Sequence, residues 1–358
     1  LRVAVLGGIA AIAFVVIVLR LWSLQVLSGT QYRATAAGNR LRTVSIDPPR
    51  GPILDRKGRV LVTNTVSTSV VLWPNDMPQG DGRDTEIRAL SRILRIPRRD
   101  IVESIKAHQN PLDPVLLKVA VHRDQIDYIY EHQAQFRGVG MKQTYLPKYN
   151  AGMSLAPVLG TVGPISAEQY AAQRKSNACR QKGDCLKQDD RIGQSGVESE
   201  YDSELRGSAG TAQLQVDAAG RQRSTLITKQ PPQPGYAVRL TIDVELQRAA
   251  ERAIRTGIQV AHDSQCTGCW ASNGGSIVAM DPNTGDVLAM ATYPTYRPSI
   301  FTGRPDPKKL KPLLDAQTAY EQNYPGLNRA IGALYPPGSV FKPVTAIAAI
   351  EQGLVSPS

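Results

Sequence analysis

The sequence begins with an uncharged apolar run over residues 3–19. At about 1.5 Å of rise per residue, a helix of this run would span roughly 26 Å, close to the thickness of the hydrocarbon core of a bilayer. Arg20 and Trp22 follow it, where a long cation can reach the lipid headgroups and an indole ring can lie at the membrane interface. The run therefore predicts a transmembrane anchor over residues 1–22, with a buried helix of a soluble protein as the alternative.

A cleaved signal peptide is a second alternative, because Ala34-Thr35-Ala36 has the small-x-small form of a cleavage site. This tripeptide lies about fifteen residues beyond the apolar run, farther than the usual layout of a signal peptide allows. We therefore expect an uncleaved, single-pass anchor and a chain whose bulk is exported.

The formal net charge of +11 would suit a nucleic-acid partner. Export across a membrane argues against that partner, so we expect no nucleic acid. Anionic lipid and cell-wall polymer fit an exported basic surface better, and a merely solvated surface is the alternative.

Four cysteines fall into two close pairs, Cys179 with Cys185 and Cys266 with Cys269. In an oxidising compartment this spacing suggests two local disulfides, although four cysteines allow three connectivities. Zinc is an alternative at the second pair, because His262 precedes it. One imidazole and two thiolates leave the usual four-ligand tetrahedron incomplete, so we expect no metal.

The chain is long enough for two or three domains, and its 42% of hydrophobic and 20% of charged residues are typical of folded globular material. The proline- and glycine-rich segment 230–235 is the best domain boundary in the sequence. We therefore expect a first domain over residues 23–235 and a second over residues 236–358.

The hydrophobic pattern predicts a mixture of helices and strands in both domains. In the first domain we expect strands and hairpins over 42–72, helices over 85–94, 101–108 and 123–136, and an exposed polar insertion over 176–191. In the second we expect a strand over 237–242 and a helix capped by Asp243. The runs 276–280 and 287–291 are apolar on both pleat faces, which predicts an antiparallel hairpin in a sheet covered on both sides.

The break Pro336-Pro337-Gly338 precedes Ser339, and an apolar run over 344–350 follows it. This order predicts that Ser339 opens a helix. Pro343 is tolerated there because the N–H groups of the first turn have no intrahelical partner. Lys342 is three residues from the serine, so the two side chains lie on one helical face.

Ser339 and Lys342 can act together as nucleophile and general base. A helix that is apolar nearly all round must be buried, and burial disfavours the charged form of a lysine. A neutral amine can take the proton of the hydroxyl and make its oxygen a nucleophile, while unpaired N–H groups at the helix start would stabilise an oxyanion. An ordinary helix-capping serine is the alternative, since a lysine three residues after a serine also arises by chance.

Longer segments around this serine resemble a known enzyme family. Asn328-Arg329-Ala330, followed by residues 335–344, resembles the active-site segment of penicillin-binding proteins, in which Ser-x-x-Lys is the first of three catalytic motifs. Further segments resemble class B members in the same order along the chain: 21–26, 39–40, 49–56, 193–198, 205–207, 240–243, 246–247 and 279–296. The chain departs from the family pattern at Pro157 and Arg297, where the family usually has a histidine and an aspartate.

The resemblance implies an α+β architecture with three parts. These are a single transmembrane helix, an elongated β-rich pedestal of the dimerisation type (residues 23–235), and the first part of a penicillin-binding transpeptidase domain of the serine β-lactamase-like type. It also implies a single-pass protein of the bacterial inner membrane with most of the chain on the extracytoplasmic side.

The resemblance further implies a peptidoglycan D,D-transpeptidase. Ser339 would attack the D-Ala-D-Ala end of a stem peptide with Lys342 as the base, release D-Ala, and pass the acyl group to an amine of a neighbouring stem peptide. β-Lactams would acylate the same serine. No metal or organic cofactor is implied. The implied partners are a membrane glycosyltransferase and other proteins of the elongation complex.

Residues 196–198 and the early pedestal resemble the elongation type of class B enzyme more than the division type. A bifunctional class A enzyme is an alternative. It would need a glycosyltransferase domain between the anchor and the transpeptidase domain, where the sequence predicts hairpins and turns instead. A non-catalytic scaffold or penicillin-binding sensor is the remaining alternative, although a sensor would not need the pedestal and a scaffold would not need Lys342. The family's Ser-x-Asn and Lys-Thr/Ser-Gly motifs do not follow Lys342, so we expect the native reading frame to continue and the 358 residues alone to be inactive.

Overall fold

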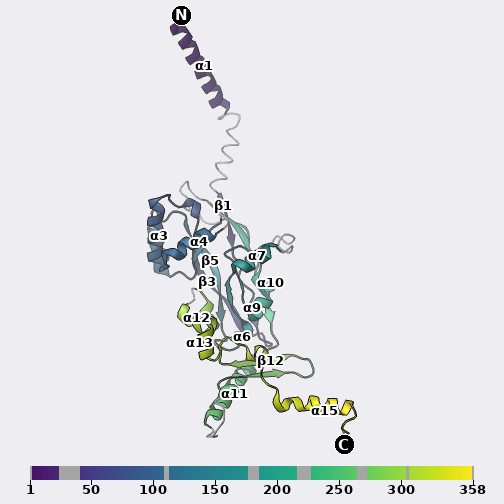
Figure 1. The fold of residues 1–358 in the computed structure, drawn as a ribbon. Coiled ribbons are helices and arrows are strands. Elements are labelled where there is room, and N and C mark those ends of the chain that lie inside the picture. Colours follow the sequence, from purple (N-terminus) through teal and green to yellow (C-terminus); the bar gives the residue numbers. More distant parts are fainter. Residues whose placement is uncertain are drawn as a thin grey trace.

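A computed structural model describes residues 2–23, 41–108, 113–175, 185–215, 227–263, 272–303 and 306–356. They form an elongated body of mixed helices and strands, with α1 (Arg2–Trp22) beyond one end and α15 (Lys342–Glu351) at the other (Figure 1). This mixture agrees with the α+β class predicted from the sequence. The predicted domain boundaries at residues 22 and 235 stay predictions.

Helix α1 covers the apolar run at the start of the chain. Its large apolar side chains from residue 12 onward are exposed, among them Phe14 at 67% and Leu19 at 59%. Within the residues that the structure describes, no helix is long and apolar enough to cross a membrane. The transmembrane anchor therefore stays a prediction.

The central sheet is organised around β3 (Val60–Leu72), a strand rich in valine and threonine. Branched side chains suit the extended, pleated backbone of a strand. β5 (Val139–Tyr149) pairs antiparallel with β3 along one edge, and β2 (Ile53–Leu54) and β4 (Val115–Lys118) pair with the two ends of the other edge. β10 (Val238–Arg239) adds to this sheet parallel to β2, so residues nearly two hundred positions apart lie side by side.

The amphipathic helices that the sequence predicted are present, and they pack against the β4 end of the sheet. They are α3 (Asp81–Leu94), α4 (Arg98–Ala107) and α5 (Arg123–Glu131), and a short turn, η2 (Pro74–Asp76), precedes them. Leu72, Leu90 and Leu94 are fully buried in the core that these helices share with β3. α5 ends at Glu131, before the predicted limit at residue 136, and the ring of the capping residue His132 stacks on Tyr128, with ring centroids 4.1 Å apart.

A second, antiparallel sheet has the order β1-β8-β9. Its strands are β1 (Leu41–Ile46), β8 (Gly210–Gln215) and β9 (Ile227–Gln230). Short elements connect the two sheets: α6 (Ala156–Leu159), β6 (Val162–Pro164), α7 (Ala167–Lys175), β7 (Arg191–Gly193), α9 (Gly196–Glu200) and α10 (Asp202–Arg206). The predicted exposed insertion is mostly half-buried over its described part, residues 185–191, where the carboxylate of Asp189 accepts a hydrogen bond from the backbone of Leu116 (3.3 Å).

The strand predicted over residues 237–242 is reduced to β10. The backbone N–H of Leu240 still donates to the carbonyl of Leu54 (2.9 Å), but the chain then turns into α11 (Val244–Asp263). The carboxylate of Asp243 accepts from the backbone N–H of Glu245 (3.0 Å), which confirms the predicted cap.

The predicted antiparallel hairpin is present as β11 (Gly275–Met280) and β12 (Val287–Tyr293). α11 covers one face, where Ile254 packs near Ala289. The expectation that the sheet is covered on both sides is wrong for the described residues, because Val278 and Met280, which point to the other face, are 45% and 57% exposed. The remaining elements are η3 (Pro298–Phe301), α12 (Pro307–Leu314), α13 (Ala316–Glu321), α14 (Arg329–Gly332), η4 (Gly338–Phe341) and α15.

A buried carboxyl group interrupts the apolar face of α3. Glu86 is 3% exposed, and neither of its carboxyl oxygens has a hydrogen-bond partner among the described residues. Burial raises the pKa of Glu86 to about 8, and the nearby Arg137 opposes this only in part. The side chain is therefore accommodated in its neutral form.

The raised pKa of Glu86 predicts how the free energy of unfolding depends on pH. Its pKa lies above the usual value of 4.5, so its contribution to folding is complete below about pH 4.5 and is lost as the pH rises towards 8. Glu86→Gln, which stays neutral, should therefore be more stable than the natural protein at pH 8.5 by about 1–3 kcal/mol, with a smaller difference at pH 5. Urea unfolding at both pH values measures this difference. An equal effect at the two pH values, or the same pattern in the exposed control Glu131→Gln, would contradict it.

Candidate functional site

Ser339 lies in η4, a 3-10 turn, and the α-helix itself begins at Lys342. The prediction that Ser339 opens a helix is confirmed, because η4 runs directly into α15, and Gly338 at φ 53° supplies the left-handed residue that begins the turn. The backbone N–H of Lys342 donates to the carbonyl of Ser339. In a 3-10 turn residues i and i+3 eclipse, so this geometry places the two residues on one face. Pro343 lies in the first turn of α15, as expected.

The helix that follows the serine is exposed, and the expectation that it must be buried is wrong for the described residues. Phe341, Val344 and Ile347 are each more than half exposed. Figure 1 shows α15 projecting from the end of the body. The apolar pattern is thus present, but its large side chains are exposed in the described part of the chain.

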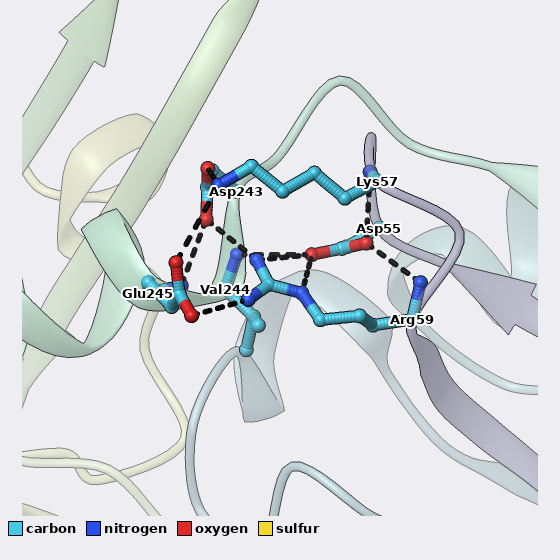
Figure 2. Close-up of polar contacts among 6 residues, drawn as sticks. All are labelled: Asp55, Lys57, Arg59, Asp243, Val244 and Glu245. Atoms are coloured by element: carbon cyan, nitrogen blue, oxygen red, sulfur yellow. Dashed lines mark hydrogen bonds and ion pairs between the residues drawn. The ribbon is translucent and has the colours of Figure 1, made fainter.

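A cluster of charged residues connects the hairpin after β2 with the start of α11 (Figure 2). Asp55 is fully buried at its centre. Its carboxylate accepts hydrogen bonds from the backbone N–H groups of Lys57 (2.9 Å), Arg59 (2.8 Å) and Val244 (3.4 Å), and from Nε of Arg59 (2.7 Å). Burial alone would raise the pKa of Asp55, but these donors outweigh it and hold the pKa below its usual value.

Arg59 extends this cluster across the junction to α11. Its guanidinium pairs with Asp55 (2.7 Å), Asp243 (2.7 Å) and Glu245 (2.7 Å), and Lys57 pairs with Asp243 (2.8 Å). The hydrogen bond from Lys57 holds the pKa of Asp243 far below its usual range; burial opposes this shift, and the backbone N–H of Glu245 and the guanidinium of Arg59 assist it. We call these five residues the junction cluster.

A second group of charges lies inside the body before residue 235. Nε of Arg50 donates to the buried carboxylate of Glu198 (2.7 Å), and its terminal nitrogen pairs with Asp202 (2.8 Å). Burial raises the pKa of Glu198, and the adjacent guanidinium opposes this. The backbone N–H of Gly51 donates to the carbonyl of Leu205 (2.7 Å). Two segments that resemble family motifs, 49–56 and 193–207, are thereby brought into contact.

The cysteine expectations fall mostly outside the described residues. Cys185 is disulfide-bonded, while Cys179, Cys266 and Cys269 lie outside the described ranges, so the predicted pairings stay predictions. His262 makes a hydrogen bond to the carbonyl of Ser272 (2.5 Å). In the part of the chain that the structure describes, no group of three or more histidine, cysteine or carboxylate side chains is arranged so that it could hold a metal ion.

The sequence motifs include most of the segments that meet at the site, but they do not show which residues contact one another. Asp55 and Asp243 belong to motif segments, yet their common partner Arg59 was not singled out. An acidic residue at the start of a helix and a basic turn far away in sequence give no signal that they pair. Only a pattern shared by many sequences, or the fold itself, could have shown it.

Comparison with known proteins identifies the two parts of the chain. The family model of the penicillin-binding protein dimerisation domain matches residues 45–240, and that of the penicillin-binding protein transpeptidase domain matches residues 275–358. Ser339 and Lys342 fall in the second match, and the junction cluster, except for Asp243 and Glu245, falls in the first.

Relatives of known function agree with these matches. The chain is 28% identical to the peptidoglycan D,D-transpeptidase MrdA of Salmonella typhimurium, over 99% of the chain and 53% of the relative, and 25% identical to stage V sporulation protein D of Bacillus subtilis, over 96% and 45%. The chain thus spans about half the length of the curated relatives it matches.

Two solved structures share the fold. One, described as structural coordination of polymerization and crosslinking by a peptidoglycan synthase complex, matches with TM-score 0.56 and 31% identity, over 100% of this chain and 56% of that chain. The other is a complex between penicillin-binding protein PBP2 and MreC from Helicobacter pylori, with TM-score 0.62 and 22% identity, over 87% and 53%. At that identity the second match shows the fold alone.

The junction cluster predicts a graded effect of charge removal. Asp55→Asn should lower the free energy of unfolding by about 3 kcal/mol, because an amide cannot accept from so many buried donors. Asp243→Asn should cost about 1 kcal/mol through the cap and its ion pairs. Glu245→Gln is the matched control and should change little, because Glu245 is 67% exposed. Urea unfolding of the three variants measures the order, and a cost for Glu245→Gln equal to that of Asp55→Asn would refute this assignment.

Proposed function

This chain belongs to the penicillin-binding proteins, and from that premise we propose that it is part of a peptidoglycan D,D-transpeptidase of the elongation type, with Ser339 as the nucleophile and Lys342 as the general base. The observation that carries the proposal is the position of these two residues. They share one face of a turn that opens a helix, within the residues that match the transpeptidase family. The relatives named MrdA support the elongation role over the division role.

The proposed reaction proceeds in two acyl transfers. The Oγ of Ser339 attacks the penultimate carbonyl of a D-Ala-D-Ala end while its proton passes to the amine of Lys342. The C–N bond to the last D-Ala breaks, and the leaving amine takes that proton. An amine of a neighbouring stem peptide then attacks the ester, gives up a proton to Lys342, and Ser339 recovers its hydroxyl. A β-lactam would stop after the first transfer.

Lys342 must be unprotonated for this role, and in the described residues it is exposed. The apolar surface of η4 and α15, including Val340, Phe341 and Val344, supports the proposal that this helix is covered when the enzyme works, because such a surface is unfavourable in water. Covering it would place Lys342 in surroundings that favour a neutral amine.

The proposed location is the bacterial inner membrane, with α1 as the anchor and the remaining chain outside the cytoplasm. The exposed apolar side chains of α1 and the interfacial Trp22 support it. One of the solved relatives is described as a peptidoglycan synthase complex that coordinates polymerization and crosslinking, and the other is a complex with MreC. We extend both partner classes to this protein, together with stem peptides and β-lactams as ligands.

The proposed nucleophile can be tested by labelling with a fluorescent penicillin in membranes of cells that make the protein from its native gene. Ser339→Ala and Lys342→Arg should each reduce the rate of labelling by at least about 10³-fold, because one removes the nucleophile and the other replaces the base with a group that stays protonated. Thr345→Val is the matched control on the same helix and should label normally. Persistent labelling of Ser339→Ala would overturn the proposal.

The proposed anchor has its own test. Placing arginines one helical turn apart, Ile12→Arg with Val16→Arg, should release the protein from alkali-washed membranes, since each charge costs roughly 2.5–3.5 kcal/mol in the middle of a membrane helix. The control pair Ile12→Leu with Val16→Leu should stay in the membrane fraction. Retention of the arginine variant at the level of the control would argue against α1 as the anchor.

A further inference from the structure

A buried arginine lies ten residues before the proposed nucleophile. Arg329, in α14, is 5% exposed. Its terminal nitrogens donate to the backbone carbonyls of Tyr324 (3.3 Å) and Asn323, and to the side-chain carbonyl of Asn323 (2.9 Å). Within the described part of the chain all of these partners are amide oxygens. A buried guanidinium held by neutral acceptors loses its hydration without an ion pair to offset that cost.

The geometry that Arg329 holds is an unfavourable turn. Asn323 has φ 55° and Tyr324 has φ 49°, so two consecutive non-glycine residues are in the left-handed region. Asparagine tolerates this conformation, but for a bulky tyrosine it is strained. The rigid fork of the guanidinium binds both carbonyls of the turn and thereby stabilises it.

The same arginine fixes this turn against the hairpin. The side chain of Asn323 donates to the carbonyl of Asn273 (2.6 Å), just before β11. Gly274 packs against the guanidinium so closely that an added Cβ would lie 2.9 Å from Nε of Arg329. The backbone N–H of Arg329 donates to the hydroxyl of Thr292 in β12 (3.2 Å). Arg329 therefore connects the turn and α14 to β12 and to the residue that precedes β11.

α14 is the last point at which the described chain is attached to the body before Ser339. Residues 333–337 form no helix or strand, and Leu334 within them is fully exposed. The position of the chain at α14 therefore sets the starting point of the short segment that leads to η4. An error at this point would displace the serine, and a displacement of about 1 Å is enough to slow an enzyme reaction strongly.

From this geometry we propose that Arg329 is a positioning residue for acylation. It acts through the turn at 323–324 and the attachment of α14, not by contact with the substrate. The inference rests on the proposed role of Ser339 and adds to it a residue that orients the nucleophile segment.

The test compares the kinetics of acylation in Arg329→Lys and in the natural protein, using fluorescent penicillin and the whole membrane-bound protein. Lysine keeps the charge but lacks the planar fork whose two nitrogens bind the two carbonyls, so the limiting rate of acylation should fall about tenfold while the half-saturating penicillin concentration changes by less than about threefold. Arg252→Lys, an exposed arginine on α11, is the matched control and should acylate normally.

A rescue experiment separates positioning from a general structural role. Adding Tyr324→Asn to Arg329→Lys lowers the backbone cost of the turn and should recover at least about threefold of the lost rate, whereas Tyr324→Asn alone should have little effect. If Arg329→Lys does not fold, Thr292→Val and Thr292→Ser replace it. The valine variant removes the hydroxyl that holds α14 and should acylate more slowly than the serine variant, which keeps it.

The outcomes distinguish the two proposals. Labelling that persists in Ser339→Ala means that the proposed function has failed. If Ser339→Ala is silent but Arg329→Lys, or Thr292→Val in its place, acylates at the natural rate, the function stands and the positioning role is refuted. A tenfold loss with no rescue by Tyr324→Asn also refutes the proposed route through the turn.

Discussion

The buried carboxylate of Asp55 is the contact on which the arrangement of the two matched regions depends. It lies fully buried between the hairpin after β2 and the start of α11, and it accepts hydrogen bonds from both. A buried carboxylate is stable only if its hydrogen-bond donors are in position. A partly formed cluster would leave the charge of Asp55 without its partners, at a large cost in free energy. Its ion pairs through Arg59 therefore fix where α11, and with it the hairpin β11–β12, leaves the first region.

The region that bears the proposed nucleophile is connected to this cluster through elements that follow one another along the chain. α11 packs on β12, β12 holds α14 through Thr292, and α14 is followed by the exposed segment that leads to Ser339. Position is thus passed along a short series of packed elements, through the apolar contacts of α11 with β12 and the hydrogen bond of α14 to Thr292. This arrangement explains why charged residues far from the serine belong to the description of its site.

Several features could be predicted from residues alone because they depend on local pattern. The amphipathic helices α3, α4 and α5, the hairpin β11–β12 and the cap at Asp243 all follow from spacing within a few residues. The contacts of Arg50 with Glu198 and of Arg59 with Asp243 could not be predicted, since they join segments more than 140 residues apart. The burial of α15 was predicted wrongly, because an apolar helix shows that a partner surface is needed but not that it is present in the same stretch of chain.

The central claim is that Ser339 forms the acyl-enzyme, and the most direct measurement is to locate the covalent adduct. Membranes containing the protein from its native gene would be treated with a penicillin, digested, and analysed by tandem mass spectrometry. The account predicts one modified peptide, with the penicilloyl group on Ser339. An adduct on any other residue, with Ser339 unmodified in the same sample, would contradict it.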